Sequence, residues 1–204
     1  MVLADSPLIL VIGVLAGLLG SLLRAWVHKG KLQIPDLHLV GLVLAAFFLQ
    51  MIGLYLPGTG RWLPVQAVSF ALVGSQILLL IFAWSNRRMA GFWLLGLGLL
   101  LNLLVIVLNG GFMPISPETV LRLAPKTRPG LLTIGARLGA TKDVILPELQ
   151  TALAFLSDRF ILPNPFTMGS SGNAVAAFSI GDVVIASGAF WVLWSFGRAR
   201  EVTE

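Results

Sequence analysis

Five apolar runs constrain this chain more than any other feature, because each is close to the roughly 20 residues that a helix needs to cross a bilayer. The runs lie at residues 8–23, 40–56, 64–84, 92–108 and 174–196. Hydrophobic residues make up 57% of the 204 residues, and charged residues only 11%. The sequence therefore predicts an all-α fold, an integral membrane helical bundle in which residues 1–204 form a single transmembrane domain.

The positions of the cations predict how this bundle is oriented. Lys and Arg residues follow the first, third and fifth runs, which an alternating path places on one side of the membrane. Because cytoplasmic loops carry an excess of Lys and Arg, we expect the N-terminus outside and the C-terminus in the cytoplasm. Residues 109–173 then form a long outer loop. No basic segment precedes the first run, which favours a retained helix over a cleaved signal peptide.

Charge and residue types narrow the partners. The formal net charge of +5 comes from cations near the ends of apolar runs, which favours lipid headgroups over nucleic acid as the partner. The chain has no cysteine, so disulfides and thiolate metal sites are excluded. His28 and His38 flank Asp36 without metal-ligand spacing, and solvated loop histidines are favoured there. We therefore predict no metal and no cofactor.

Small and amide side chains interrupt the apolar runs. Gly13 and Gly17 in the first run let helix backbones approach closely, and packing within the bundle is favoured over a dimer interface. Four amide side chains are expected to hydrogen-bond across the bundle or to line a cavity. They are Gln50, Gln66, Gln76 and Asn102.

The outer loop opens with a motif that ends the fourth helix in an irregular backbone. Its residues are Asn109, Gly110, Gly111, Met113 and Pro114. Ser116 is expected to cap a short helix that runs through Leu123. Residues 147–159 place Leu149, Leu153 and Leu156 on one helical face, which predicts a short helix that lies at the interface or packs on the bundle.

Asp182 places a carboxylate inside the last apolar run, about 12 Å below its outer end if that helix begins at residue 174 and rises about 1.5 Å per residue. A charge at such depth is costly and usually has a partner or a task. The carboxylate could accept a hydrogen bond from Gln66, Gln76 or Asn102, or pair with a cation of the outer loop. Either interaction would fix the last helix within the bundle.

Asp158 offers Asp182 a different partner. Its simplest interpretation is a solvated surface pair with the adjacent Arg159. If Asp158 and Asp182 met in a low-dielectric site, repulsion would hold one protonated and one ionised. An aspartic protease uses this arrangement to activate water.

Three motifs carry a resemblance over most of the chain. They are Asn-Gly-Gly-x-Met-Pro at 109–114, Leu-x-Asp at 156–158 and Ser-x-Gly-Asp at 179–182. The combination resembles an uncharacterised family of small bacterial multi-pass membrane proteins, classed only as a domain of unknown function. That resemblance implies no activity.

A shorter stretch is similar to signal peptidase II, an intramembrane aspartic protease. Phe178, Asp182, Ile185 and Gly188 match the motif of its final helix. Residues 158–159 match its Asp-Arg pair, and residues 109–111 are similar to its Asn-x-Gly element. This resemblance implies a catalytic dyad formed by two aspartates, at positions 158 and 182.

Three functional hypotheses follow for a protein of the bacterial inner membrane. The first is a non-catalytic structural or partner-binding component, with a polar site at the outer leaflet that meets another membrane protein. The second is an aspartic protease that acts on a lipoprotein-like substrate. The third is a proton- or cation-coupled carrier that uses Asp182. The expected functional surface comprises Asn109, Gly110, Gly111, Met113, Pro114, Asp158, Ser179, Gly181 and Asp182.

Overall fold

The fold is mostly helical, as predicted, in a computed structural model that describes residues 8–55, 63–125, 127–139, 141–163 and 175–198. The helices over the apolar runs are α1 (Leu8–Val27), α2 (Gly41–Gln50), α4 (Val65–Ser85), α5 (Ala90–Leu108) and α7 (Ile180–Trp194). A π-helical turn, Met51–Tyr55, continues α2. Within the described residues, α1, α4 and α5 are long and apolar enough to cross a membrane, whereas α2 with its π turn and α7 are shorter.

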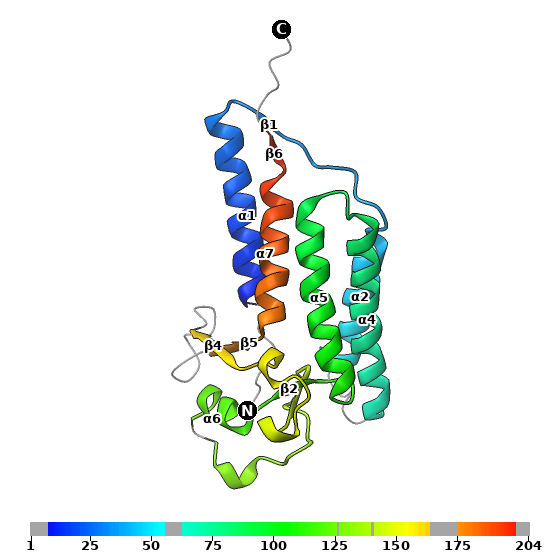
Figure 1. The fold of residues 1–204 in the computed structure, drawn as a ribbon, viewed down its shortest axis with the longest axis vertical. Helices are drawn as coiled ribbons and strands as arrows, with labels where there is room; N and C mark the ends of the chain where they lie inside the picture. Colours follow the sequence, from blue (N-terminus) through cyan, green and yellow to red (C-terminus); the bar gives the residue numbers. More distant parts are fainter. Residues whose placement is uncertain (1–7, 56–62, 126, 140, 164–174, 199–204) are drawn as a thin grey trace.

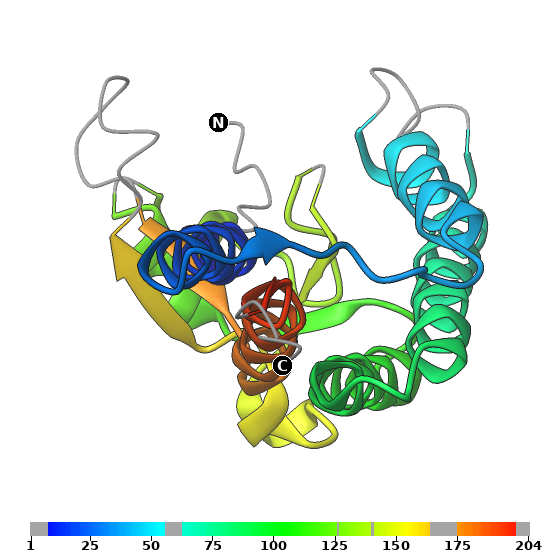
Figure 2. The same cartoon turned by 90° about the horizontal axis from the view of Figure 1, so that it is seen from above.

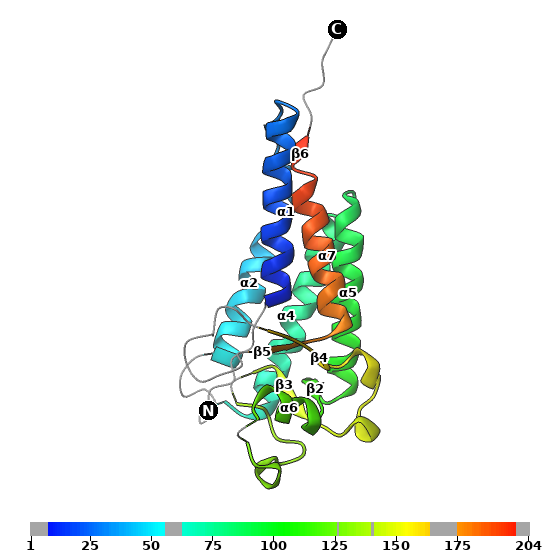
Figure 3. The same cartoon turned by 90° about the vertical axis from the view of Figure 1, so that its left-hand side faces the viewer.

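The helices pack as a curved row in the order α1, α7, α5, α4 and α2, each against the next (Figure 1). Figure 2 shows that the row bends, so that its two ends, α1 and α2, lie toward the same side. The segment between α5 and α7 lies at one end of the helices, and the short strands β1 (Lys31–Leu32) and β6 (Gly197–Arg198) pair at the other (Figure 3). The two sides of the predicted membrane protein are thus built from different parts of the chain.

Glycines explain the close packing of α1, α7 and α5. A Cβ atom at Gly17 of α1 would lie 2.8 Å from the carbonyl oxygen of Phe190 in α7. A Cβ atom at Gly98 of α5 would lie 2.6 Å from the amide nitrogen of Ile185 in α7. Real Cβ atoms do not come this close, so these positions require glycine. The expected use of small residues within the bundle is confirmed.

The segment between α5 and α7 contains strands that the sequence did not lead us to expect. Strand β2 (Met113–Ile115) pairs in parallel with β3 (Asp143–Ile145), and β4 (Phe160–Pro163) pairs antiparallel with β5 (Val175–Phe178). Helix α6 (Pro117–Leu123) and three short 3₁₀ turns, at Pro129–Leu131, Glu148–Gln150 and Ala154–Leu156, complete it. The prediction of α6 is confirmed, since Ser116 Oγ accepts a hydrogen bond of 3.2 Å from the Thr119 amide.

The interfacial helix expected over residues 147–159 is wrong. Two 3₁₀ turns occupy this stretch, separated by Leu153 with a left-handed φ of 55°. The expected apolar face does not exist, because Leu149 is fully exposed while Leu156 is buried. The backbone of Ala152 is held instead by the Asn109 side chain, at 2.9 and 3.0 Å, which draws it away from a helical path.

The helix expected over residues 174–196 also begins later than its hydropathy suggested. Residue 174 lies outside the described residues, and residues 175–178 form strand β5. Helix α7 starts at Ile180, so Asp182 is its third residue and lies in the first helical turn. The carboxylate expected deep within a span therefore lies at the N-terminal end of a helix.

A charged cluster at the N-terminal end of α7

The first turn of α7 places Asp182 by a capping box. Ser179 Oγ accepts a hydrogen bond from the Asp182 amide at 3.0 Å, and Asp182 Oδ2 accepts one from the Ser179 amide at 3.0 Å. These reciprocal bonds satisfy backbone donors that the helix start would otherwise leave without partners. The aspartate is held in one orientation by its own helix.

Asn102 of α5 connects this cap to the neighbouring helix. Its Nδ2 donates to Asp182 Oδ1 at 2.8 Å, and its Oδ1 accepts from Ser179 Oγ at 3.0 Å. A Cβ atom at Gly181 would overlap Asn102 Oδ1, so glycine is required there for the amide to reach the cap. Of the hydrogen-bond partners that the sequence offered for Asp182, the structure selects Asn102.

Lys142 connects Asp158 to Asp182, and these three side chains form the charged cluster. Its Nζ lies 3.1 Å from Asp158 Oδ2 and 3.6 Å from Asp182 Oδ2. Asp158 is almost fully buried, with 2% of its side chain exposed, whereas the Lys142 and Asp182 side chains are 23% and 24% exposed. The predicted surface pair of Asp158 with Arg159 is therefore wrong, and Arg159 lies 3.2 Å from Glu148 instead.

The small sheet positions Lys142 and Asp158 around β2. Lys142 immediately precedes β3, which pairs with β2, and the Asp158 amide donates to the Pro114 carbonyl at 3.2 Å. Met113 and Pro114 are fully buried. These two residues of the predicted surface thus hold Lys142 and Asp158 in place through backbone pairing and are not exposed to a partner.

The Asn-Gly-Gly part of the motif is a connection between elements. Asn109 ends α5, as its C-cap interpretation predicts, and its side chain bonds to backbone groups of Val105 and Ala152. Gly110 and Gly111 have positive φ values of 78° and 87°. A Cβ atom at Gly111 would overlap Ser69 Oγ of α4. Asn109, Gly110 and Gly111 therefore shape the loop that leads to β2.

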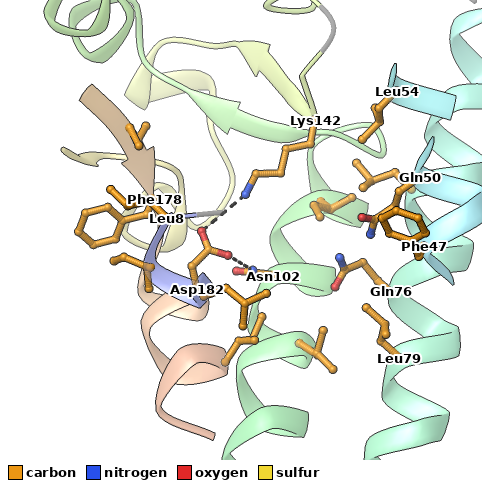
Figure 4. A pocket seen from close by; sticks show the side chains of 18 of the residues that line it. Leu8, Phe47, Gln50, Leu54, Gln76, Leu79, Asn102, Lys142, Phe178 and Asp182 are labelled. Carbon is orange, nitrogen blue, oxygen red and sulfur yellow. Dashed lines mark hydrogen bonds and ion pairs between the residues drawn. The ribbon is translucent and has the colours of Figure 1, made fainter. Parts of the chain in front are cut away.

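The charged cluster forms part of the wall of a cavity of about 470 Å³ (Figure 4). The helices α1, α2, α4, α5 and α7 line this cavity, together with β4, β5 and Lys142, and most of the lining side chains are apolar. The polar lining residues are Gln50, Gln76, Asn102, Lys142 and Asp182. In Figure 4, the Asn102 side chain lies between those of Asp182 and Gln76, and Lys142 reaches Asp182 from the other side of the carboxylate.

The chemistry of the cluster follows from the lysine between its two carboxylates. An ammonium ion within 4 Å of a carboxylate favours its charged form. Two aspartates that shared a proton would lose part of their attraction to Lys142. The cluster is therefore better suited to binding a polar group of a ligand than to acid–base catalysis. In the described part of the chain, no three His, Asp or Glu side chains are grouped in a way that could hold a metal ion.

Lys142 is the functional candidate that sequence reasoning missed. It is one of several cations in a loop without regular periodicity, and the pairing of β2 with β3 that places it is not local. The one available signal was chemical, because a buried carboxylate requires a cation or several donors. The Ser-x-x-Asp spacing of the capping box was a second signal, and it gives the true start of α7.

Comparison with known proteins gives a family for most of the chain. Residues 35–194 match the model of a family described as "Family of unknown function (DUF5317)". This range includes every residue of the charged cluster and most of the cavity lining. No curated protein and no solved structure matches the chain.

Proposed function

The chain belongs to this family of unknown function, DUF5317, and we propose that it is a non-catalytic, integral membrane protein that binds an amphipathic molecule in its cavity. One observation carries the proposal: a charged cluster lies in the wall of a cavity that is otherwise largely apolar. Cavities of about 300–1,000 Å³ with apolar walls and a few placed polar groups are typical of small-molecule sites. An amphipathic ligand could place its hydrocarbon chain against the apolar wall and its polar headgroup beside the charged cluster.

Exposed apolar side chains support the membrane part of this proposal. Leu19 of α1, Phe70 of α4 and Trp93 of α5 are 60%, 76% and 57% exposed, and each lies on a helix long enough to span. Soluble monomers rarely leave extensive apolar surface open to water, and lipid would cover these side chains. With the orientation that the cations predict, the charged cluster lies at the outer leaflet of a bacterial inner membrane.

Binding is a better match to the cluster than proteolysis. Peptide hydrolysis by two carboxyl groups requires that one of them keeps a proton. The Lys142 ammonium group forms an ion pair with both carboxylates, at 3.1 and 3.6 Å, and two carboxyl groups that shared one proton would lose part of this pairing. A carrier would need a continuous polar path, for which the apolar lining gives little support.

The test is saturable binding by the protein in phosphatidylcholine nanodiscs. Radiolabelled dodecylamine, dodecanol and dodecyl phosphate share one chain and differ in the head. We expect at least one of them to bind above the level of empty nanodiscs, with one site per protein.

A pair of variants on α1 localises this binding. Leu10 lines the cavity and is 38% exposed, whereas Leu19 is exposed on the same helix outside it. Leu10→Trp is expected to weaken the best probe by about tenfold, which corresponds to about 1.4 kcal/mol. Leu19→Trp should bind as the wild type does. The proposal fails if no probe saturates, or if the two variants behave alike.

A further inference from the structure

Helices α4 and α5 each leave an apolar stripe exposed on the face that points away from the cavity. The stripe of α4 comprises Phe70, Ile77, Ile81 and Trp84, and that of α5 comprises Trp93, Leu97, Leu100, Leu104 and Val107. Spacings of three, four and seven residues place each set on one side of its helix. The cavity-lining Leu72 and Leu99 each lie two residues beyond a stripe residue, which is about 200° around an α-helix. The stripes are therefore a second apolar surface, separate from the cavity.

The two stripes meet at the turn between α4 and α5. The rings of Trp84 and Trp93 pack edge to face there, with their centroids 5.9 Å apart. A Cβ atom at Gly96 would lie 3.6 Å from the Cβ atom of Ala83, so small residues bring the two helices together just inside this end. Tryptophan is enriched where a membrane meets water. The aromatic pair therefore indicates that lipid headgroups lie at the level of this turn.

The turn also presents two exposed arginines, Arg87 and Arg88. Arg87 Cζ lies 4.6 Å from the centroid of the Trp84 ring, and Arg87 Nη1 donates to the Trp84 carbonyl at 3.0 Å. This cation–π contact holds a positive charge beside the end of the stripes. Within the described part of the chain, neither arginine forms an ion pair with a carboxylate. Both guanidinium groups can therefore pair with an anion from outside the chain.

A buried asparagine fixes the shape of this turn. Asn86 Nδ2 donates to the carbonyls of His38 and Phe82, at 2.9 and 2.8 Å, and Asn86 Oδ1 accepts from the His38 amide at 2.8 Å. These bonds fasten the turn to its own helix and to the segment before α2. A site that is already ordered loses less conformational freedom when it binds.

We infer that this face of α4 and α5 binds an anionic phospholipid. Its phosphate would lie beside Arg87 and Arg88, and its chains would lie along the two stripes. Cations near a membrane surface attract anionic headgroups, and the stripes supply the apolar contact that the chains require. The inference rests on the membrane location in the proposed function and is independent of the cavity and its ligand.

A second copy of the chain is a poorer match to the same face. Two copies in one membrane have the same orientation, so a symmetric contact through the stripes would bring their α4–α5 turns to the same depth. Arg87 and Arg88 of each copy would then face those of the other, and like charges repel. An anionic lipid brings the opposite charge.

The experiment is native mass spectrometry of the full chain, released from dodecyl maltoside micelles that contain dioleoylphosphatidylglycerol or dioleoylphosphatidylcholine. We expect a monomer that retains one phosphatidylglycerol, with an affinity about tenfold greater than that for phosphatidylcholine. Equal retention of the two lipids, retention of neither, or a dimer without bound lipid would overturn the inference.

A double variant assigns the preference to the turn. Arg87→Gln with Arg88→Gln is expected to lower phosphatidylglycerol affinity to that of phosphatidylcholine, whose retention should stay unchanged as the measure of an intact surface. Lys29→Gln with Lys31→Gln is the matched control, because these exposed lysines lie at the same end of the helices (Figure 1). Persistence of the preference in the arginine variant, or its loss in the lysine variant, would contradict the inference.

Two further measurements keep the test decisive. If the double variant does not fold, Arg88→Gln alone decides, because it leaves the contacts of Arg87 with Trp84 in place. It should weaken phosphatidylglycerol binding by about threefold, and an unchanged affinity would overturn the inference. Excess glycerol 3-phosphate, which has the phosphate but no chains, should not displace the lipid. Displacement would show a site for free phosphate instead. All these outcomes leave the dodecyl-probe test of the cavity unaffected.

Discussion

The two sides of the cavity are built differently. On the side of α7 and α5, glycines bring the backbones together, and a Cβ atom at Gly98 would lie 2.7 Å from the Gly181 carbonyl oxygen. On the side of α4 and α2, a Cβ atom at Gly74 would have no neighbouring atom within 4 Å, and α2 continues as a π-helical turn. Dense packing fixes side chains in place. The side of α7 and α5, here the fixed side, therefore holds Asp182 in position, whereas the side of α4 and α2, here the open side, leaves room for a methyl group at Gly74.

The largest expected change in stability comes from removing Lys142, and it tests whether the charged cluster helps to hold the fixed side together. Lys142→Met removes the only ammonium group that the described residues place between the two carboxylates, and should destabilise the protein by roughly 3 kcal/mol. Reversible unfolding by sodium dodecyl sulfate in mixed micelles would measure this. Adding Asp158→Asn should restore part of the loss, since the repulsion between carboxylates is then removed.

Arg159→Met provides the matched control for that measurement. Its partner Glu148 and its own side chain are 58% and 42% exposed, and exposed pairs contribute about 0–1 kcal/mol. If both variants lost the same small amount of stability, the cluster would be no more than a surface network.

A pair of glycine substitutions compares the two sides directly. Gly98→Ala forces a methyl group against α7 and should cost about 1–3 kcal/mol. Gly74→Ala places the same methyl group in open space within α4 and should be neutral or stabilise by up to about 1 kcal/mol. The same unfolding measurement applies, and equal losses at both positions would remove the distinction between the fixed and open sides.

The loop that leads to the cluster provides a smaller effect. Asn109→Ala removes hydrogen bonds of 2.7, 2.9 and 3.0 Å to Val105 and Ala152 and should cost about 1–2 kcal/mol. Because these bonds lie outside the cluster, the affinity of the best dodecyl probe should change by less than about twofold. A collapse of affinity without loss of stability would place Asn109 in the site itself.

The smallest effect is expected on the open side. Gln76→Met removes a buried oxygen that lacks a partner among the described residues, so stability should stay within about 1 kcal/mol of the wild type or rise. A marked destabilisation would show that the amide is part of the fold, and that its oxygen is not kept available for a ligand.

Local sequence patterns account for the helices but not for the start of α7. Apolar length predicted α1, α4 and α5, and small residues predicted the close packing of α7 against α1 and α5. Residues 175–178 are Val-Ala-Ala-Phe, an apolar run too short to distinguish a strand from a helix by periodicity. Hydropathy therefore extended α7 through β5 and placed Asp182 too deep.

Non-local contacts explain why only part of the site was predictable. Ser179, Gly181, Asp182 and Asn102 could be connected through helix chemistry, because each lies on or beside an apolar run. Lys142 and Asp158 reach the cluster through pairings with β2, and residues 113–115 and 143–145 are far apart in sequence. No local pattern separates Lys142 from the other cations of that segment.

Photolabelling tests the central claim most directly, because it reports where an amphiphile binds. A long-chain amphiphile with the head of the best dodecyl probe and a diazirine in its chain would be activated in nanodiscs that contain the protein, and the adducts would be mapped by mass spectrometry. We predict labelling of the cavity residues Leu72, Leu99 and Ile185, suppressed by an excess of that probe. Labelling spread over exposed positions such as Phe70 and Trp93, without such suppression, would contradict the account.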